Sequence, residues 1–160
     1  MNKRNMQYIK LMNFDKESNA VFNRAIQFSH SENCGEINAV HLFLAMLEKT
    51  SFGQDILEGL DISFDMVYES YQKIAESGSY GSNDGSVDPY NLDNMAHELF
   101  VLLATVTSKM AIRGKSVNSK SLFEGLLDLD SEVLNDFLEY IDVSVEDIKS
   151  ANKNKFCIPE

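Results

Sequence analysis

The feature of the sequence that most constrains its fold is an internal repeat. Residues 57–63 read Leu-Glu-Gly-Leu-Asp-Ile-Ser, and 81 residues later residues 138–144 read Leu-Glu-Tyr-Ile-Asp-Val-Ser. A match of this length within one chain indicates that a structural unit has been duplicated. Shorter matches support it: Leu42-Phe43 with Leu122-Phe123 at a spacing of 80 residues, and Asp15 and Phe22 with Asp93 and Phe100 at a spacing of 78.

The first copy of the repeat has the residue spacing of α-helices. After Asp15, a predicted N-cap, apolar residues recur every three or four positions up to about residue 33. Residues 40–47 are apolar nearly all round, and their unbranched Leu, Ala and Met side chains favour a buried helix over a buried strand. Two shorter helices are predicted, one over residues 54–60 and one that begins after a cap at Ser63.

These patterns predict an all-α fold with two pseudo-symmetric four-helix repeats, packed together as one domain of about eight helices. Each repeat is small for an independent core, so we expect the two to bury apolar faces against each other. A stretch rich in Gly, Ser, Asn and Asp separates them and predicts a linker without a core. The predicted parts are a leader 1–13, repeat one 14–76, the linker 77–91, repeat two 92–152 and a tail 153–160.

The charge of the chain argues against some partners. The net charge is −11, which disfavours binding to phosphate backbones and to anionic membranes. A basic or apolar protein partner is compatible with it, although solubility alone also accounts for such a surface. The most acidic stretch, residues 124–147, contains nine acidic residues and neither Lys nor Arg. It is either a solvated helical face or a docking surface for a basic partner.

Nothing in the sequence predicts export or membrane insertion. No long apolar run follows the first four residues, and no stretch approaches the length of a membrane span. Cys34 and Cys157 are far apart and lack the spacing of a metal or redox motif. We therefore expect a cytoplasmic protein with reduced thiols.

The sequence also lacks patterns that predict catalysis, a metal site or a cofactor. His30 and His97 have no partner at metal-ligand spacing, and Cys34 has no evident base, so a buried filler role is expected for this Cys. His41 is expected to be structural, with its ring hydrogen-bonded across a turn. Residues 128–139 faintly resemble a calcium loop, but Val133 stands where the turn requires Gly. No phosphate-binding loop for ATP occurs in the chain.

The order and spacing of these segments resemble the duplicated N-terminal domain of Clp-type AAA+ unfoldases. In that family each repeat has a long capped helix, a turn, a β-branched residue followed by Gly-Thr-Glu-His, and a Leu-rich helix. Residues 37–47 and 117–127 of this chain have this layout, and the blocks 57–63 and 138–144 match a later family pattern. The resemblance covers about residues 14–150, and it depends on the duplication and not on any single motif.

The resemblance implies a non-catalytic domain, monomeric when isolated, that docks adaptor proteins or protein substrates for a ring-shaped ATPase. The ATPase would lie in the same chain or in a partner chain, and residues 156–160 resemble the linker that leads into an ATPase module. A free-standing protein that regulates assembly of a Clp complex is the alternative. The resemblance places the binding surface, by position, at Ala39, Val40, Ser119 and Lys120.

One departure from the family pattern concerns phosphoarginine. In members that bind it, the Glu of Gly-Thr-Glu-His holds the guanidinium group in each repeat. Val40 and Lys120 stand at these positions here, and neither can pair with a guanidinium cation. We therefore expect weak or no phosphoarginine binding. Ser119 with Lys120 could instead hold a bare anion at the start of a helix.

Overall fold

The computed structural model describes residues 14–82 and 95–156, the last four of these by their backbone only. Over these residues the chain is all-α, as predicted, and two short bridges are the only extended pairings. The predicted leader lies outside the described residues. The first repeat contains α2 (Lys16–Ser31), α3 (Ala39–Lys49), α4 (Ser51–Leu60) and α5 (Phe64–Glu76), and the second contains α6 (His97–Ile112), α7 (Ser119–Asp128), α8 (Glu132–Tyr140) and α9 (Val145–Phe156).

The duplication is visible in the helix boundaries, but one predicted spacing is wrong. Helices α2 and α6 begin 81 residues apart, so Asp15, the N-cap of α2, corresponds to Ala96 and not to Asp93. In the same frame Phe22 corresponds to the buried Leu103, whereas Phe100 is only half-buried. The predicted match followed residue identity, while the structure aligns the positions at which the two helices begin.

Side-chain caps explain where most of the helices begin. The carboxylate of Asp15 accepts a hydrogen bond from the Ser18 amide at 2.8 Å, and the Ser63 hydroxyl accepts one from the Met66 amide at 3.2 Å. Such bonds satisfy amides that have no partner within the first turn of a helix. Both caps were predicted from the sequence, and both are confirmed.

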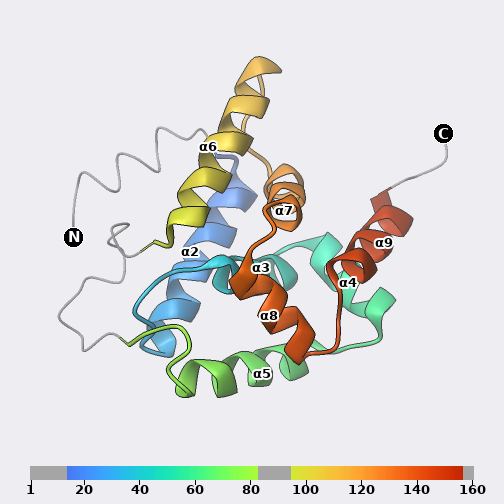
Figure 1. Cartoon of the computed structure of the whole chain (residues 1–160). Helices are drawn as coiled ribbons and strands as arrows, with labels where there is room; N and C mark the ends of the chain where they lie inside the picture. The colour runs from blue at the N-terminus through green and yellow to red at the C-terminus, as the bar shows by residue number, and fades with distance from the viewer. Residues whose placement is uncertain (1–13, 83–94, 157–160) are drawn as a thin grey trace.

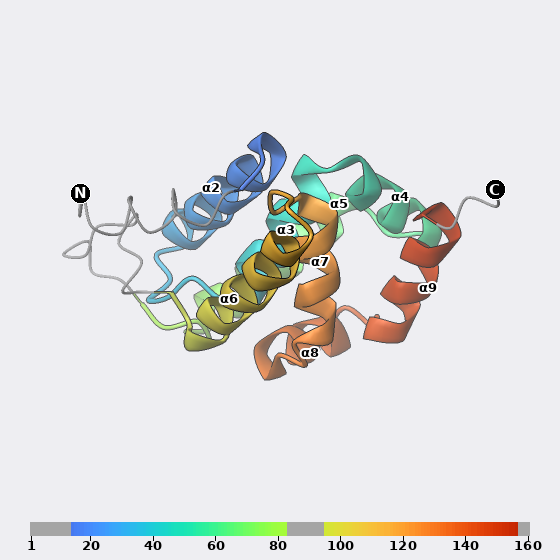
Figure 2. The same ribbon diagram turned by 90° about the horizontal axis from the view of Figure 1, so that it is seen from above.

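Helix α3 is the centre of the core. It runs through the middle of the molecule in both views, and every side chain from residue 39 to residue 47 is buried (Figure 1 and Figure 2). Its Phe43 stacks on Phe123 of α7, with ring centroids 6.3 Å apart. Phe52 of α4 packs on the same ring at 5.2 Å. The two repeats therefore share one core, as predicted from their small size.

Two backbone bridges also join the repeats, and each has a counterpart in the other half. Phe14 pairs with Val117, and Ile37 pairs with Met95. The Asp15 amide donates to the Val117 carbonyl at 2.8 Å, and the Ala96 amide donates to the Ile37 carbonyl at 2.8 Å. The segment before the first helix of each repeat thus pairs with the segment before the second helix of the other. Figure 1 also shows α9 beside α4, on which it packs.

The beginning of the predicted linker belongs to the core, which corrects the expectation that it has none. Tyr80 is only 5% exposed and stacks on Tyr71, with ring centroids 6.0 Å apart. Its carbonyl accepts a hydrogen bond from the Gly35 amide at 3.0 Å. A side chain at Gly35 would meet the Ser82 backbone at 3.0 Å, so this close approach requires Gly. The predicted boundary at the C-terminal end also differs from the structure. Helix α9 continues to Phe156, whereas the tail was predicted to begin at residue 153.

Candidate docking surface

The four residues predicted to bind a partner lie at the N-termini of α3 and α7. Each helix begins with a capping box, in which Asn38 or Asn118 is the N-cap. Ala39 and Val40 are fully buried, however, and Ser119 is only 6% exposed. Lys120 alone has an exposed side chain. The predicted surface is thereby reduced to Lys120, because the start of each helix faces the contact between the repeats.

The N-terminus of α7 is also a poor site for the anion considered above. The Ser119 hydroxyl donates a hydrogen bond to the carboxylate of Glu17, which lies on α2 of the other repeat. A carboxylate therefore already lies beside the amides that would hold an anion, and it would repel a second negative charge.

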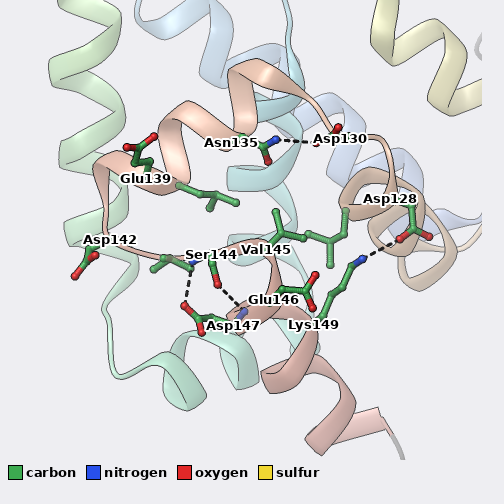
Figure 3. Close-up of a pocket in the computed structure, with 13 residues that line it drawn as sticks. Asp128, Asp130, Asn135, Glu139, Asp142, Ser144, Val145, Glu146, Asp147 and Lys149 are labelled. Carbon is green, nitrogen blue, oxygen red and sulfur yellow. Dashed lines mark hydrogen bonds and ion pairs between the residues drawn. The ribbon is translucent and has the colours of Figure 1, made fainter.

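A larger open surface lies in the second repeat, where α7, α8 and α9 meet. This groove, which we term the second-repeat groove, has a volume of about 690 Å³. Figure 3 shows carboxylates on the helices and on the turns that surround it. Its apolar lining comes from Leu127, Leu138, Val143 and Val145. Its charged lining consists of one cation, Lys149, and six acidic residues: Asp128, Asp130, Glu139, Asp142, Glu146 and Asp147.

Three of the six carboxylates have partners within the groove (Figure 3). Lys149 pairs with Asp128 at 3.2 Å, and the Asn135 amide donates to Asp130 at 3.0 Å. Asp147 accepts from the Ser144 amide at 3.1 Å in a capping interaction at the start of α9. The carboxylates of the other three acidic residues make no hydrogen bond or ion pair with another described residue, and all three residues are exposed: Glu139, Asp142 and Glu146.

The first repeat has a matching groove of about 570 Å³ beside α4 and the start of α5. Each residue that lines it has a counterpart, 81 residues later, in the lining of the second-repeat groove. The counterparts of Glu58 and Asp61, for example, are Glu139 and Asp142. The sequence analysis did not predict the first-repeat groove. It did single out residues 124–147, which contain every acidic residue of the second-repeat groove, as either a solvated face or a docking surface. The full lining of the first groove is Gln54, Leu57, Glu58, Asp61, Ile62, Ser63 and Phe64.

Three solved structures share this arrangement of helices over most of the chain. The Hsp104 N-terminal domain from Candida albicans matches with a TM-score of 0.63 and 12% identity, over 89% of this chain and 91% of that one. The N-terminal domain of the caseinolytic protease associated chaperone ClpD from Arabidopsis thaliana matches with a TM-score of 0.64 and 12% identity, over 89% and 94%. The chain has the fold of a Clp N-terminal domain.

A third structure, from preliminary structural investigations of a malarial protein secretion system, matches with a TM-score of 0.60 and 18% identity, over 90% of this chain and 95% of that one. No protein-family model matches the sequence, and no curated protein matches it. The Clp N-terminal fold is therefore established by structure, at identities that say nothing by themselves about partners. The predicted fold class and the resemblance to Clp N-terminal domains are both confirmed at the level of fold.

Within this Clp N-terminal fold, His41 has the structural role that was predicted for it. Its Nδ1 accepts a hydrogen bond from the Asn38 amide at 2.9 Å, and its ring packs edge-on against Tyr71 and Tyr80. Burial lowers its pKa to about 3, so the ring is neutral near pH 7. The same cap exists in the second repeat, where Ser121 accepts from the Asn118 amide at 3.3 Å. The capping role of His41 is therefore present in both repeats.

Cys34 is a buried filler, as predicted. Its Sγ lies 3.5 Å from the hydroxyl of Tyr71, which also contacts the Phe28 carbonyl at 2.7 Å. Burial raises the pKa of the Cys34 thiol, so the reactive thiolate is disfavoured. No group of His, Cys, Asp or Glu within residues 14–82 and 95–156 is arranged to hold a metal ion. No helix in these ranges is long and apolar enough to cross a membrane.

Proposed function

We propose that this chain is a docking domain that binds adaptor proteins or protein substrates for a Clp-type ATP-dependent unfoldase. The observation that carries the proposal is the extent of the structural match. Two of the matched chains are themselves N-terminal domains of an Hsp100-type protein and a Clp protease-associated chaperone, and 91% and 94% of their lengths are covered. The likeness therefore spans the whole domain and not one helical motif.

Features of the described surface support a binding role. Its two matched grooves combine apolar side chains with carboxylates, so a protein segment could be held there by apolar contact and by complementary charge. Within the described part of the chain, Cys34 has no adjacent base, and His41 is buried and neutral. We propose that the domain works in the cytoplasm on a ring-shaped ATPase, which lies in its own chain or in a partner chain. The affinity of one domain for its partner would be modest, and the several copies in the ring would strengthen binding through avidity.

A chimeric unfoldase tests this function. Residues 14–156 replace the N-terminal domain of a Clp-type unfoldase whose processing of a permanently unfolded protein depends on that domain. We expect the chimera to process this substrate faster than the same ring with no N-terminal domain, at an unchanged ATPase rate. A chimera as slow as the truncated ring, with the domain shown to be folded by its helical circular dichroism, would contradict the proposal.

The expectation about phosphoarginine belongs to the same proposal. Val40 has no exposed surface, and Lys120 places a cation where a guanidinium group would need an anion. We expect calorimetric titration of the domain with free phosphoarginine to give no measurable heat of binding. A saturable isotherm with micromolar affinity would overturn this expectation while leaving the docking function intact.

A further inference from the structure

We infer that the second-repeat groove binds a basic segment of a partner protein, anchored by an aliphatic side chain that is flanked by Lys or Arg. This inference names the partner chemistry of the proposed docking function and depends on that function for its biological role. It rests on three observations: the unbalanced charge of the groove, its apolar floor, and its difference from the matching groove of the first repeat.

The charge of the groove is not balanced from within. Six carboxylates face one cation, and Lys149 already pairs with Asp128. Glu139, Asp142 and Glu146 remain exposed, and their carboxylates make no hydrogen bond or ion pair with another described residue. Three carboxylates along one groove create a local negative potential that attracts a cationic partner.

Two of the acidic residues of the groove lie at helix ends that favour a cation. The carbonyl ends of helices favour cations, and α2, α3, α5 and α6 each have a basic residue in the last turn. Helices α7 and α8, whose C-terminal ends line the groove, have none, and α4 of the first repeat also has none. Instead Asp128 and Glu139 lie in their last turns, where a negative charge opposes the helix dipole. An external cation would relieve this repulsion.

The floor of the groove gives a partner an apolar anchor. Leu127 and Leu138 are 6% and 1% exposed, and Val143 and Val145 are half-buried beside them. Val143 and Val145 supply the exposed apolar surface, so an aliphatic side chain that contacts them would remove apolar surface from water on both partners. The carboxylates, by contrast, do not converge on one point, since the described residues contain no group that could hold a metal ion. A spread of acidic groups around an apolar floor fits an extended segment better than an ion.

The first-repeat groove is built from the corresponding residues but has fewer acidic side chains. Two acidic residues line it, Glu58 and Asp61, against six in the second. At two further positions the acidic Asp147 and the basic Lys149 correspond to the uncharged Met66 and Tyr68. The grooves therefore offer similar shapes with different charge, and the basic partner is assigned to the second.

Fluorescence anisotropy with a short labelled peptide of alternating Lys and Leu tests the assignment. The test variant combines Glu139→Gln, Asp142→Asn and Glu146→Gln. Asn tolerates the left-handed backbone of Asp142, whose φ is 60°. With each exposed ion pair contributing about a twofold change in Kd, we expect the variant to bind about tenfold more weakly. We also expect binding to the wild-type domain to weaken steeply as salt rises from about 50 mM to about 500 mM.

The chain provides a matched control in its first repeat. Glu58→Gln, Asp61→Asn and Asp65→Asn remove the same charge at the positions 81 residues earlier, all exposed, so long-range charge effects are equalised. We expect the control variant to keep wild-type affinity within about twofold. Equal weakening in both variants would overturn the inference, because net charge and not the groove would then explain binding.

Further arms separate this inference from the proposed function and from other occupants. If the domain bound a neutral unfolded protein but not the basic peptide, the groove assignment would be overturned and the docking function would stand. Failure to bind either probe would count against both. Deletion of residues 1–13, which contain Lys3, Arg4 and Lys10, should leave peptide affinity unchanged. If the deletion raised peptide affinity about tenfold, the groove would be assigned to the chain's own leader. If the domain formed a dimer in sedimentation that the peptide dissociated, the groove would be assigned to a second copy. Either result would overturn the inference.

Discussion

The cap of α3 makes the stability of the domain depend on pH through one residue, His41. Its ring is fully buried, and burial lowers its pKa to about 3, whereas an exposed His titrates near pH 6.5. Between these two values the unfolded chain binds a proton that the folded chain does not. The stability that the neutral ring contributes is therefore present above about pH 6.5 and is lost as the pH falls towards 3.

We expect His41 to reduce the free energy of unfolding by about 2 kcal/mol between pH 7 and pH 5. His41→Gln keeps an acceptor for the Asn38 amide but cannot titrate, so its stability should change less over this range. Urea denaturation of both proteins at the two pH values gives the difference. Glu36, whose pKa is raised by burial and by Glu98, is present in both proteins, so its contribution cancels when the two changes in stability are compared. Parallel pH profiles would show that His41 is not responsible.

Among the helices, α6 lacks a side-chain cap that its counterpart α2 has. Ala96 makes no such hydrogen bond, whereas Asp15 accepts one from the Ser18 amide at 2.8 Å. We expect Ala96→Ser to raise the free energy of unfolding by about 1 kcal/mol and Asp15→Ala to lower it by a similar amount. Urea midpoints at constant m-value measure both. A loss of stability in Ala96→Ser would mean that the Ala96 site cannot accommodate a hydroxyl.

The contact between α3 and α4 depends on a Gly at a position where the two backbones meet. A Cβ at Gly53 would lie 2.5 Å from the Met46 carbonyl and 2.6 Å from that of Leu47. At Gly59, in the same helix, it would meet the Ala151 side chain at 3.3 Å. We expect Gly53→Ala to destabilise the domain by about 3 kcal/mol and Gly59→Ala to change stability by less than about 1 kcal/mol. Thermal unfolding ranks the two, and equal midpoints would contradict the proposed close approach.

The sequence predicted the elements better than the contacts between them. Apolar spacing and the caps at Asp15 and Ser63 are local, so the helices could be placed within a few residues. The burial of Tyr80 was missed because it depends on the approach of Gly35 from a distant turn. The same limit applies to the predicted binding residues. Val40 was chosen because of its position in the family pattern, but its side chain is buried by the packing of α3, which the sequence alone does not reveal.

For the whole molecule, the crossed pairing of the two repeats means that neither is complete alone. Phe14 of the first repeat pairs with Val117 of the second, and Met95 of the second pairs with Ile37 of the first. The Phe123 ring packs against Phe43 and Phe52 across the boundary between the repeats. Separating the repeats would therefore expose aromatic surface in both, at a length where a single core is marginal.

We expect residues 14–82 and 95–156, produced as separate polypeptides, to lack a cooperative unfolding transition by circular dichroism in urea. Mixed in equal amounts, they should regain helical signal and form a complex of one copy of each, as measured by sedimentation. The physical reason is that the shared core supplies the burial that each half lacks. Phe123→Ala in the second half should weaken this reassociation, because it removes the ring that contacts both α3 and α4. A single half that unfolds cooperatively near the urea midpoint of the intact chain would show that the duplicated unit is self-sufficient.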